Sequence, residues 1–217
     1  MNHELMNHEL TNHELTNHQY PNMKWTENGI HIFELTIDDA EWLSKIAKKA
    51  YFDNYTHLWY DDGAWYAEYC FNVERLRLEL SDENAQFLGI EDATEPLGFL
   101  KINMDYPLSK TRCQSKDLAL LTFDTDEIPN ALELERIYLT KSGQGRGIGQ
   151  RLVQLTFDVA RTGGKDVVWL KAMDASPAIG FYEKMGFTKC CTMNLGYEKM
   201  KTELRGMKAL KKDIFSD

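Results

Sequence analysis

A loop with three glycines at alternate positions, residues 144–149 (QGRGIG), is the motif in this chain with the clearest chemistry. It follows an apolar run at residues 134–139 and opens into a helical pattern that begins near Ile148. Glycine lets the backbone turn tightly and brings N–H groups close to a ligand, because no Cβ intervenes. At the start of a helix, those N–H groups and the helix dipole bind phosphate or pyrophosphate. The loop therefore predicts a site for a phosphorylated ligand.

Two common phosphate-binding motifs do not account for this loop. The dinucleotide-binding fingerprint would need a further glycine where the chain has Gln150. The P-loop pattern, Gly-x-x-x-x-Gly-Lys followed by Ser or Thr, occurs nowhere in the sequence. Two further segments flank the loop at ordinary spacings: a strand-like run upstream, residues 134–139 (LERIYL), and an aromatic helical segment downstream, residues 181–187 (FYEKMGF).

Together these three segments, in this order, resemble the GCN5-related N-acetyltransferase (GNAT) family. The glycine loop is similar to the family's Arg/Gln-x-x-Gly-x-Gly/Ala loop, which grips the pyrophosphate of acetyl-coenzyme A. The upstream run is similar to the family's fourth strand, and the downstream segment to its F-Y-x-x-x-G-F signature. The resemblance covers roughly residues 30–204. It implies an acetyl-CoA-dependent acyltransferase with an α/β (α+β) fold, in which a mixed central sheet has helices on both faces.

The resemblance also implies which residues bind the donor. The main chain of the loop would hold the pyrophosphate, with Arg146 adding a charge-assisted contact. The strand would pair its main chain with the pantetheine arm, and the N–H of Leu139 would stabilise the oxyanion. Where the family commonly has an asparagine, the chain has Ala175, so that Ser176 would have to supply a hydroxyl instead. The predicted donor-binding residues are Ile137, Tyr138, Leu139, Gln144, Gly145, Arg146, Gly147, Ile148, Gly149 and Ser176.

Two side chains are candidates for proton transfer. A primary amine has a pKa of ~10.4 and is mostly protonated at neutral pH, and a carboxylate near the thioester can take that proton, directly or through water. By resemblance Glu135 is the first candidate for this base, and Glu133, two residues back on the same face, is the second. Tyr182 matches the tyrosine that protonates the departing coenzyme A sulfur, for which a phenol of pKa ~10 is suited. The alternative roles are structural. Glu133 and Glu135 would then be surface or salt-bridged carboxylates, and Tyr182 would be a core tyrosine with a hydrogen-bonded hydroxyl.

The acceptor is indicated only by a partial resemblance. Residues 55–58 (YTHL) and 132–138 (LELERIY) are similar to polyamine N-acetyltransferases of the PaiA kind. We therefore expect acetyl transfer to a primary amine of a small molecule, with a polyamine as one acceptor, by direct attack in a ternary complex. Two alternatives stay open: acetylation of a protein N-terminus or lysine, and a non-catalytic acetyl-CoA-binding sensor.

Composition narrows the partners. The formal net charge of −9 argues against nucleic acid, which needs a basic face. The same charge is compatible with steering a cationic substrate or with ordinary solubility. No apolar run approaches a membrane span, and no signal-peptide pattern opens the chain, so we expect a cytoplasmic protein. The four cysteines form no CxxC pair, so reduced thiols are expected. An unsatisfied strand edge near the C-terminal hairpin favours a homodimer.

The chain divides into an extension and one domain. Residues 1–24 contain a repeat of Asn-His-Glu-Leu and are expected to form a low-complexity, flexible extension. Its four histidines recur every five residues and share no helical or strand face, so no metal site is expected. Residues 25–217 are expected to form a single acetyltransferase domain.

Periodicity and capping residues predict the elements of that domain, while residues 106–130 resist assignment and are expected to form an insertion at the pocket edge. We expect the basic residues 208–212 to form a solvated tail. Strands are predicted at residues 30–35, 85–90, 97–104, 132–139 and 167–170, and a final hairpin at 188–195 and 198–204. Helices are predicted at residues 38–50, 148–162 and 177–185, with a further helix that ends near residue 80.

Overall fold

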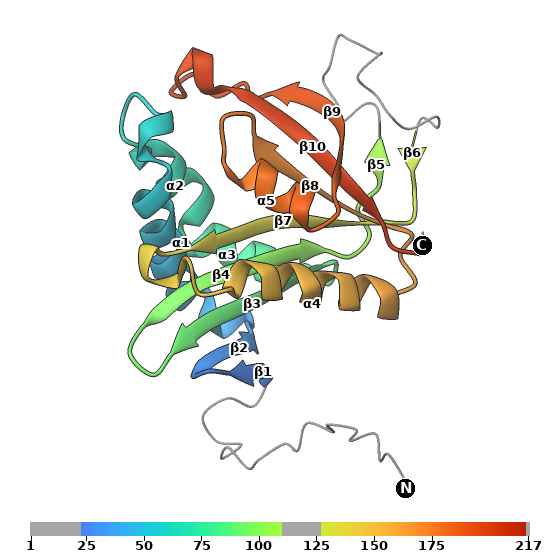
Figure 1. Cartoon of the computed structure of the whole chain (residues 1–217). Helices are drawn as coiled ribbons and strands as arrows, with labels where there is room; N and C mark the ends of the chain where they lie inside the picture. Colours follow the sequence, from blue (N-terminus) through green and yellow to red (C-terminus); the bar gives the residue numbers. More distant parts are fainter. Residues whose placement is uncertain (1–22, 110–126, 216–217) are drawn as a thin grey trace, which may run out of the picture.

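The computed structural model describes residues 23–109 and 127–215 of the chain. These residues form an eight-stranded mixed sheet with helices packed on it (Figure 1). Every pair of neighbouring strands is antiparallel except β7 and β8, which are parallel. In spatial order the strands are β1 (Met23–Glu27), β2 (Ile30–Glu34), β3 (Ala85–Asp92), β4 (Pro96–Asn103), β7 (Ala131–Leu139), β8 (Val167–Met173), β10 (Gly206–Asp213) and β9 (Thr188–Asn194). A separate pair joins β5 (Leu108–Ser109) to β6 (Glu127–Ile128).

Helices cover both faces of this sheet, as the resemblance implies. On one face lie α1 (Ala40–Asn54), α2 (Ala64–Phe71) and α3 (Val73–Leu80), which pack in one core cluster with Phe87 and Phe99. The other face carries α4 (Ile148–Thr162) and α5 (Ala178–Lys184), which share a second cluster (Figure 1). The apolar stripe expected on the first helix is buried, since Ala40, Leu43, Ile46, Ala47 and Ala50 are all at most 3% exposed. The predicted fold class is confirmed.

The two parallel strands separate halfway along their length. β7 pairs with β8 only where residues 131–134 face residues 167–170, so residues 135–139 have no strand partner on that edge. On its other edge β7 contains a bulge, because Arg136 faces Lys101 while Leu134 faces Ile102, which leaves Glu135 as the extra residue. A bulge bends its strand and increases the local twist. The opened edge of β7 is therefore available to a ligand.

The C-terminal part corrects the predicted hairpin. Residues 188–194 form β9 as expected, but the strand that pairs with it is β10, while residues 198–204 form turns with one 3-10 helix, Thr202–Leu204. The basic residues 208–212 are not a solvated tail, because β10 lies between β8 and β9. Their lysines surround Ala209 and Leu210, which are fully buried, and this apolar pair holds the segment in the sheet.

Other expectations have mixed outcomes. Residues 1–22 of the predicted extension and residues 110–126 of the predicted insertion lie outside the described residues, while the last two residues of the predicted extension, 23 and 24, begin β1. Cys70 and Cys190 are free thiols as expected, whereas Cys191 is disulfide-bonded, which corrects the expectation of reduced thiols. Within the described ranges, no helix is long and apolar enough to cross a membrane, and no group of three His, Cys, Asp or Glu side chains is placed to hold a metal ion.

Candidate active site

The glycine loop adopts the conformation that its sequence predicts. Gly145 and Gly147 have φ of 71° and 77°, in the left-handed region, and Gly147 immediately precedes α4. A Cβ at either position would meet nothing within 4 Å, so glycine is required here by backbone conformation and not by space. The first N–H groups of a helix have no intrahelical acceptor, and Arg151 starts the pattern here by donating to Gly147 O at 3.1 Å. The loop therefore presents N–H donors to an anion.

Two polar side chains of the loop attach it to its surroundings. Gln144 Nε2 donates to Asn54 Oδ1 at 2.6 Å, and Asn54 Nδ2 donates to the carbonyl of Leu139 at 2.8 Å. Arg146 Nη1 donates at 2.8 Å to Oδ2 of Asp92, the last residue of β3. Hydrogen bonds from Thr94 and this contact with Arg146 hold the pKa of the Asp92 carboxyl well below its usual range. Asn54 and Asp92 were not singled out from the sequence, because each lies far from the loop along the chain.

A cavity of about 710 Å³ extends from the glycine loop along the ends of β7 and β8 to α5. We call it the glycine-loop cavity. Ala175 also lines it, at the position where the family has asparagine. Arg146 does not line it, and Tyr138 lines a neighbouring cavity instead. The predicted donor-binding residues that do line it are Ile137, Leu139, Gln144, Gly145, Gly147, Ile148, Gly149 and Ser176.

The open edge of β7 directs main-chain groups toward this cavity. Just beyond the strand, the N–H of Thr140 donates to Leu97 O at 2.9 Å, so it points toward β4. N–H groups of successive residues in a strand point to opposite sides. The N–H groups of Leu139 and Ile137 therefore point away from β4, to the edge that β8 leaves free. The N–H of Leu139, which is the predicted oxyanion donor, therefore points to the side of β7 on which the glycine-loop cavity lies.

A second cavity, of about 370 Å³, lies beside the first among α1, α2, β7 and β8. Tyrosine and tryptophan side chains form much of its wall, among them Tyr51, Trp59 and Tyr138, so we call it the aromatic cavity. Tyr55 and Tyr182 line both cavities. Two spaces, one beside the glycine loop and one with aromatic walls, thus share a wall that includes these two phenols.

Tyr182 is placed to donate a proton where the cavities meet. Its side chain is 9% exposed, and its ring packs against Phe181 and Phe187 with centroid distances of 5.1 and 5.7 Å. Burial, with a smaller effect of Tyr55, raises the pKa of the Tyr182 phenol well above its usual value, so the hydroxyl is protonated at neutral pH. Among the described residues its hydroxyl has no hydrogen-bond partner. The oxygen is therefore available to a group in the cavity.

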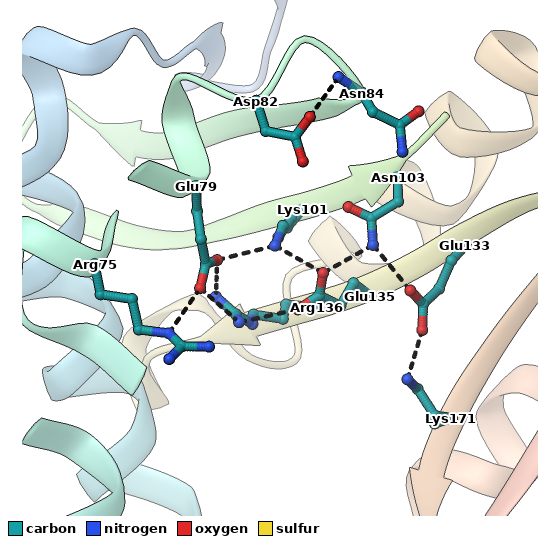
Figure 2. Close-up of polar contacts among 10 residues, drawn as sticks. All are labelled: Arg75, Glu79, Asp82, Asn84, Lys101, Asn103, Glu133, Glu135, Arg136 and Lys171. Atoms are coloured by element: carbon teal, nitrogen blue, oxygen red, sulfur yellow. Dashed lines mark hydrogen bonds and ion pairs between the residues drawn. The ribbon is translucent and has the colours of Figure 1, made fainter. Parts of the chain in front are cut away.

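Glu135 lies in an ion-pair network at the wall of the aromatic cavity (Figure 2). Its carboxylate forms ion pairs with Lys101 Nζ at 2.8 Å and with Arg136 Nη2 at 2.9 Å, and it accepts a hydrogen bond from Asn103 Nδ2 at 2.8 Å. Burial alone would raise its pKa, but Arg136 and Lys101 outweigh burial and lower the pKa of Glu135 to about 2. Its carboxylate is thus ionised and already paired.

Glu133 lies behind this wall and lines neither cavity. Its side chain is 1% exposed; one oxygen accepts from Asn103 Nδ2 at 2.9 Å, and the other is 2.7 Å from Lys171 Nζ, an ion pair outside hydrogen-bond geometry. Asn103 therefore bridges Glu133 and Glu135, which places both carboxylates on one face of β7, as expected (Figure 2). Further along the network, Glu79 accepts from Arg136.

Comparisons with known proteins agree with this geometry. The model of the acetyltransferase (GNAT) family matches residues 42–187. An uncharacterised N-acetyltransferase encoded in the pepI 3′ region of Lactobacillus delbrueckii subsp. lactis is 30% identical over 130 residues, which are 59% of this chain and 66% of that protein. The chain thus spans just under two thirds of that relative's length.

Solved structures share the fold at low sequence identity. The PaiA N-acetyltransferase from Thermoplasma acidophilum, in complex with coenzyme A, is 19% identical with a TM-score of 0.61, over 85% of this chain and 98% of that one. Spermidine N-acetyltransferase from Vibrio cholerae, in complex with CoA and spermine, is 14% identical with a TM-score of 0.59, over 86% and 96%. With the family model matching most of its length, the chain belongs to the acetyltransferase (GNAT) family, and the predicted class of acetyl-CoA-dependent acyltransferase is confirmed.

Proposed function

We propose that this protein transfers the acetyl group of acetyl-CoA to a primary amine of a small molecule, by direct attack while both substrates are bound. One observation carries the proposal: the glycine-loop cavity and the aromatic cavity meet at Tyr182. A donor that fills the first and an acceptor that fills the second would bring their reacting atoms together beside a protonated phenol. Such placement replaces a bimolecular encounter by a reaction within one complex.

The residues of the glycine-loop cavity fit acetyl-CoA. The N–H groups of residues 145–149 at the start of α4 suit the pyrophosphate, and the N–H groups of Ile137 and Leu139, which point away from β4, suit the amide-bearing pantetheine arm. Bound acetyl-CoA would supply an acetyl thioester. Arg146 is paired with Asp92, so it would hold the loop in place, and its contact with phosphate stays a prediction. Ser176 lines the cavity two residues before α5, whose N-cap is Pro177, and its hydroxyl accepts from Ala178 N at 3.1 Å.

The proposed reaction assigns each proton. The neutral amine attacks the carbonyl carbon, so that a C–N bond forms as the C–S bond breaks. The N–H of Leu139 stabilises the charge that develops on the carbonyl oxygen. Tyr182 gives its proton to the departing sulfur and regains one from solvent. The proton that the nitrogen loses leaves by way of Glu135 or a water bound to it.

Glu135 acts in this proposal as an ionised group that binds such a water. It is the one carboxylate among the described residues that lines the aromatic cavity. A carboxyl group with a pKa of about 2 binds protons weakly at neutral pH, so it does not store the proton. Glu133, the second candidate, is buried behind the wall and has no access to the amine.

The polyamine class comes to this chain only from the neighbours and the partial sequence resemblance. Proteins of similar fold include spermidine N-acetyltransferases, but sequence identity of 14% supports the fold alone. A location in the cytoplasm and a homodimer are likewise predictions. Light scattering of the purified chain tests the dimer, for which the outer edge of β9 at the end of the sheet is the predicted contact.

The test of the function follows coenzyme A thiol release from acetyl-CoA with spermidine, spermine, small amines, amino acids, aminoglycosides and N-terminal peptides. Acetyl-CoA binding is measured in parallel by calorimetry. Release with a small amine supports the proposal, and release with peptides alone favours the protein-acetylating alternative. Binding without release from any acceptor favours the sensor. Absence of binding would refute the assignment of the glycine loop.

A further inference from the structure

The ionisable side chains that line the aromatic cavity are mostly cationic. Arg75, Arg136 and Lys171 line it with one carboxylate, Glu135. Burial raises the pKa of the buried tyrosines and of the Cys70 thiol in the same wall, so these groups carry no negative charge at neutral pH. The wall itself therefore has more positive than negative charge.

The carboxylates behind the wall do not reverse this excess. In the network of Figure 2, the four cations Arg75, Lys101, Arg136 and Lys171 share three carboxylates, those of Glu79, Glu133 and Glu135. Each of these carboxylates is already in contact with at least one cation. A ligand with several ammonium groups would find no uncommitted carboxylate here, and burying unpaired charges is costly.

One of the cations has uncommitted donors. Arg75 uses Nε–H to bond Glu79 Oε1 at 3.1 Å, and its guanidinium lies 4.9 Å from the ring centroid of Tyr69. The side chain is 42% exposed, and Figure 2 shows its terminal nitrogens directed away from Glu79. A guanidinium has five N–H groups in a fork that matches a carboxylate. Lys171, 32% exposed, adds positive charge from β8.

We propose that the acceptor is a primary amine that also carries a carboxylate, an amino acid or a close analogue, and that Arg75 binds this carboxylate in the aromatic cavity. This inference rests on the proposed acetyl transfer. The amine would lie toward Tyr182, where the two cavities meet, and the carboxylate toward α3. A volume of about 370 Å³ holds one small ligand of this kind, and the ring faces suit its apolar part.

The test compares amines that differ by one carboxylate: phenylalanine with 2-phenylethylamine, lysine with cadaverine, and ornithine with putrescine, with spermidine as the polycation. Thiol release gives kcat/KM for each, expressed per unit of neutral amine, because an α-amine has a lower pKa than its decarboxylated partner. Arg75→Gln is the test variant. Arg77→Gln is its control, since Arg77 lies on the same helix, is 45% exposed, pairs with Glu74 and lines neither cavity.

We expect the carboxylated member of at least one pair to be preferred by tenfold or more. Arg75→Gln should reduce that preference at least fivefold, mainly through KM, while Arg77→Gln leaves it unchanged. Equal or better use of the decarboxylated amines or spermidine would overturn this inference and leave acetyl transfer intact, as would a preference that survives Arg75→Gln. Failure to acetylate any small amine would overturn both.

Discussion

Replacing Tyr182 by phenylalanine removes one hydroxyl from the place where the two cavities meet. The ring should stay where it is, because its contacts with Phe181 and Phe187 do not involve the oxygen. No described residue loses a hydrogen bond. We therefore expect the free energy of unfolding to change by less than about 1 kcal/mol, as is usual where no packing or buried pairing is lost.

The effect on the chemical step should be much larger. General acid catalysis by a positioned side chain contributes roughly 10²–10⁴-fold. At about 1.4 kcal/mol per tenfold change, the loss of the hydroxyl should raise the barrier by about 3–5 kcal/mol. Without the hydroxyl, the sulfur must leave as a thiolate or take its proton from water. Acetyl-CoA affinity should stay within about twofold, because the variant changes none of the loop donors.

Single-turnover acetylation, measured by rapid quench with acetyl-CoA and enzyme in excess over the acceptor, isolates this step from product release. Tyr60→Phe is the matched control: Tyr60 is 66% exposed and lines neither cavity, so its loss of a hydroxyl should leave the rate unchanged. A Tyr182→Phe rate within threefold of the native rate, with intact folding and binding, would refute the assignment of Tyr182 as the acid.

Three further predictions follow from the same site. Glu79→Gln should lower the free energy of unfolding by about 3 kcal/mol in urea denaturation, because it removes a negative charge that pairs with the buried guanidinium of Arg136. The control Glu74→Gln changes a side chain that is 81% exposed, and it should leave the free energy of unfolding almost unchanged. Gly147→Ala and Gly164→Ala, with φ of 77° and 63° and open space around both, should each cost about 1 kcal/mol in thermal unfolding, but only Gly147→Ala should raise KM for acetyl-CoA. Because the pKa of Glu135 is about 2, the acid limb of kcat/KM should follow the pKa of the substrate amine and stay in place in Glu135→Gln; a limb near pH 6–7 that disappears in this variant would contradict the weak-base assignment.

Local signals in the sequence predicted much of this fold. The helix at Ile148–Thr162 ends before two glycines, and the β3–β4 hairpin has an acidic turn, so both were predicted close to their bounds. The strand β10 was not predicted, because lysines flank its buried pair, Ala209 and Leu210, and a lysine-rich segment indicates a solvent-exposed one. The break between α2 and α3 was also not predicted, although Asn72 is the N-cap of α3 and its side chain accepts from Arg75 N.

The candidate site was predictable only where its residues are adjacent in the chain. The glycine loop and Tyr182 are read from short motifs, whereas the bulge at Glu135 depends on how β7 pairs with β4. The cations that hold this carboxylate are Lys101 on β4 and Arg136 on β7, and the pairing of the two strands brings Lys101 to it, so no local pattern could show that its pKa would be low. A sequence motif thus located the glutamate, and only the fold determined its basicity.

The charge of the whole chain and the charge of the aromatic cavity act over different distances. A net charge of −9 generates a field that draws cations toward the protein, but salt screens that field within about 8–10 Å. Inside the aromatic cavity a ligand meets Arg75 and Lys171 at close range, with Glu135 already paired. Because these residues lie 36 to 96 positions apart, composition alone could point to a polycation while the folded wall favours a carboxylate. Added salt should therefore slow the association of cationic amines with this enzyme. It should not change the preference of the aromatic cavity for a carboxylated amine.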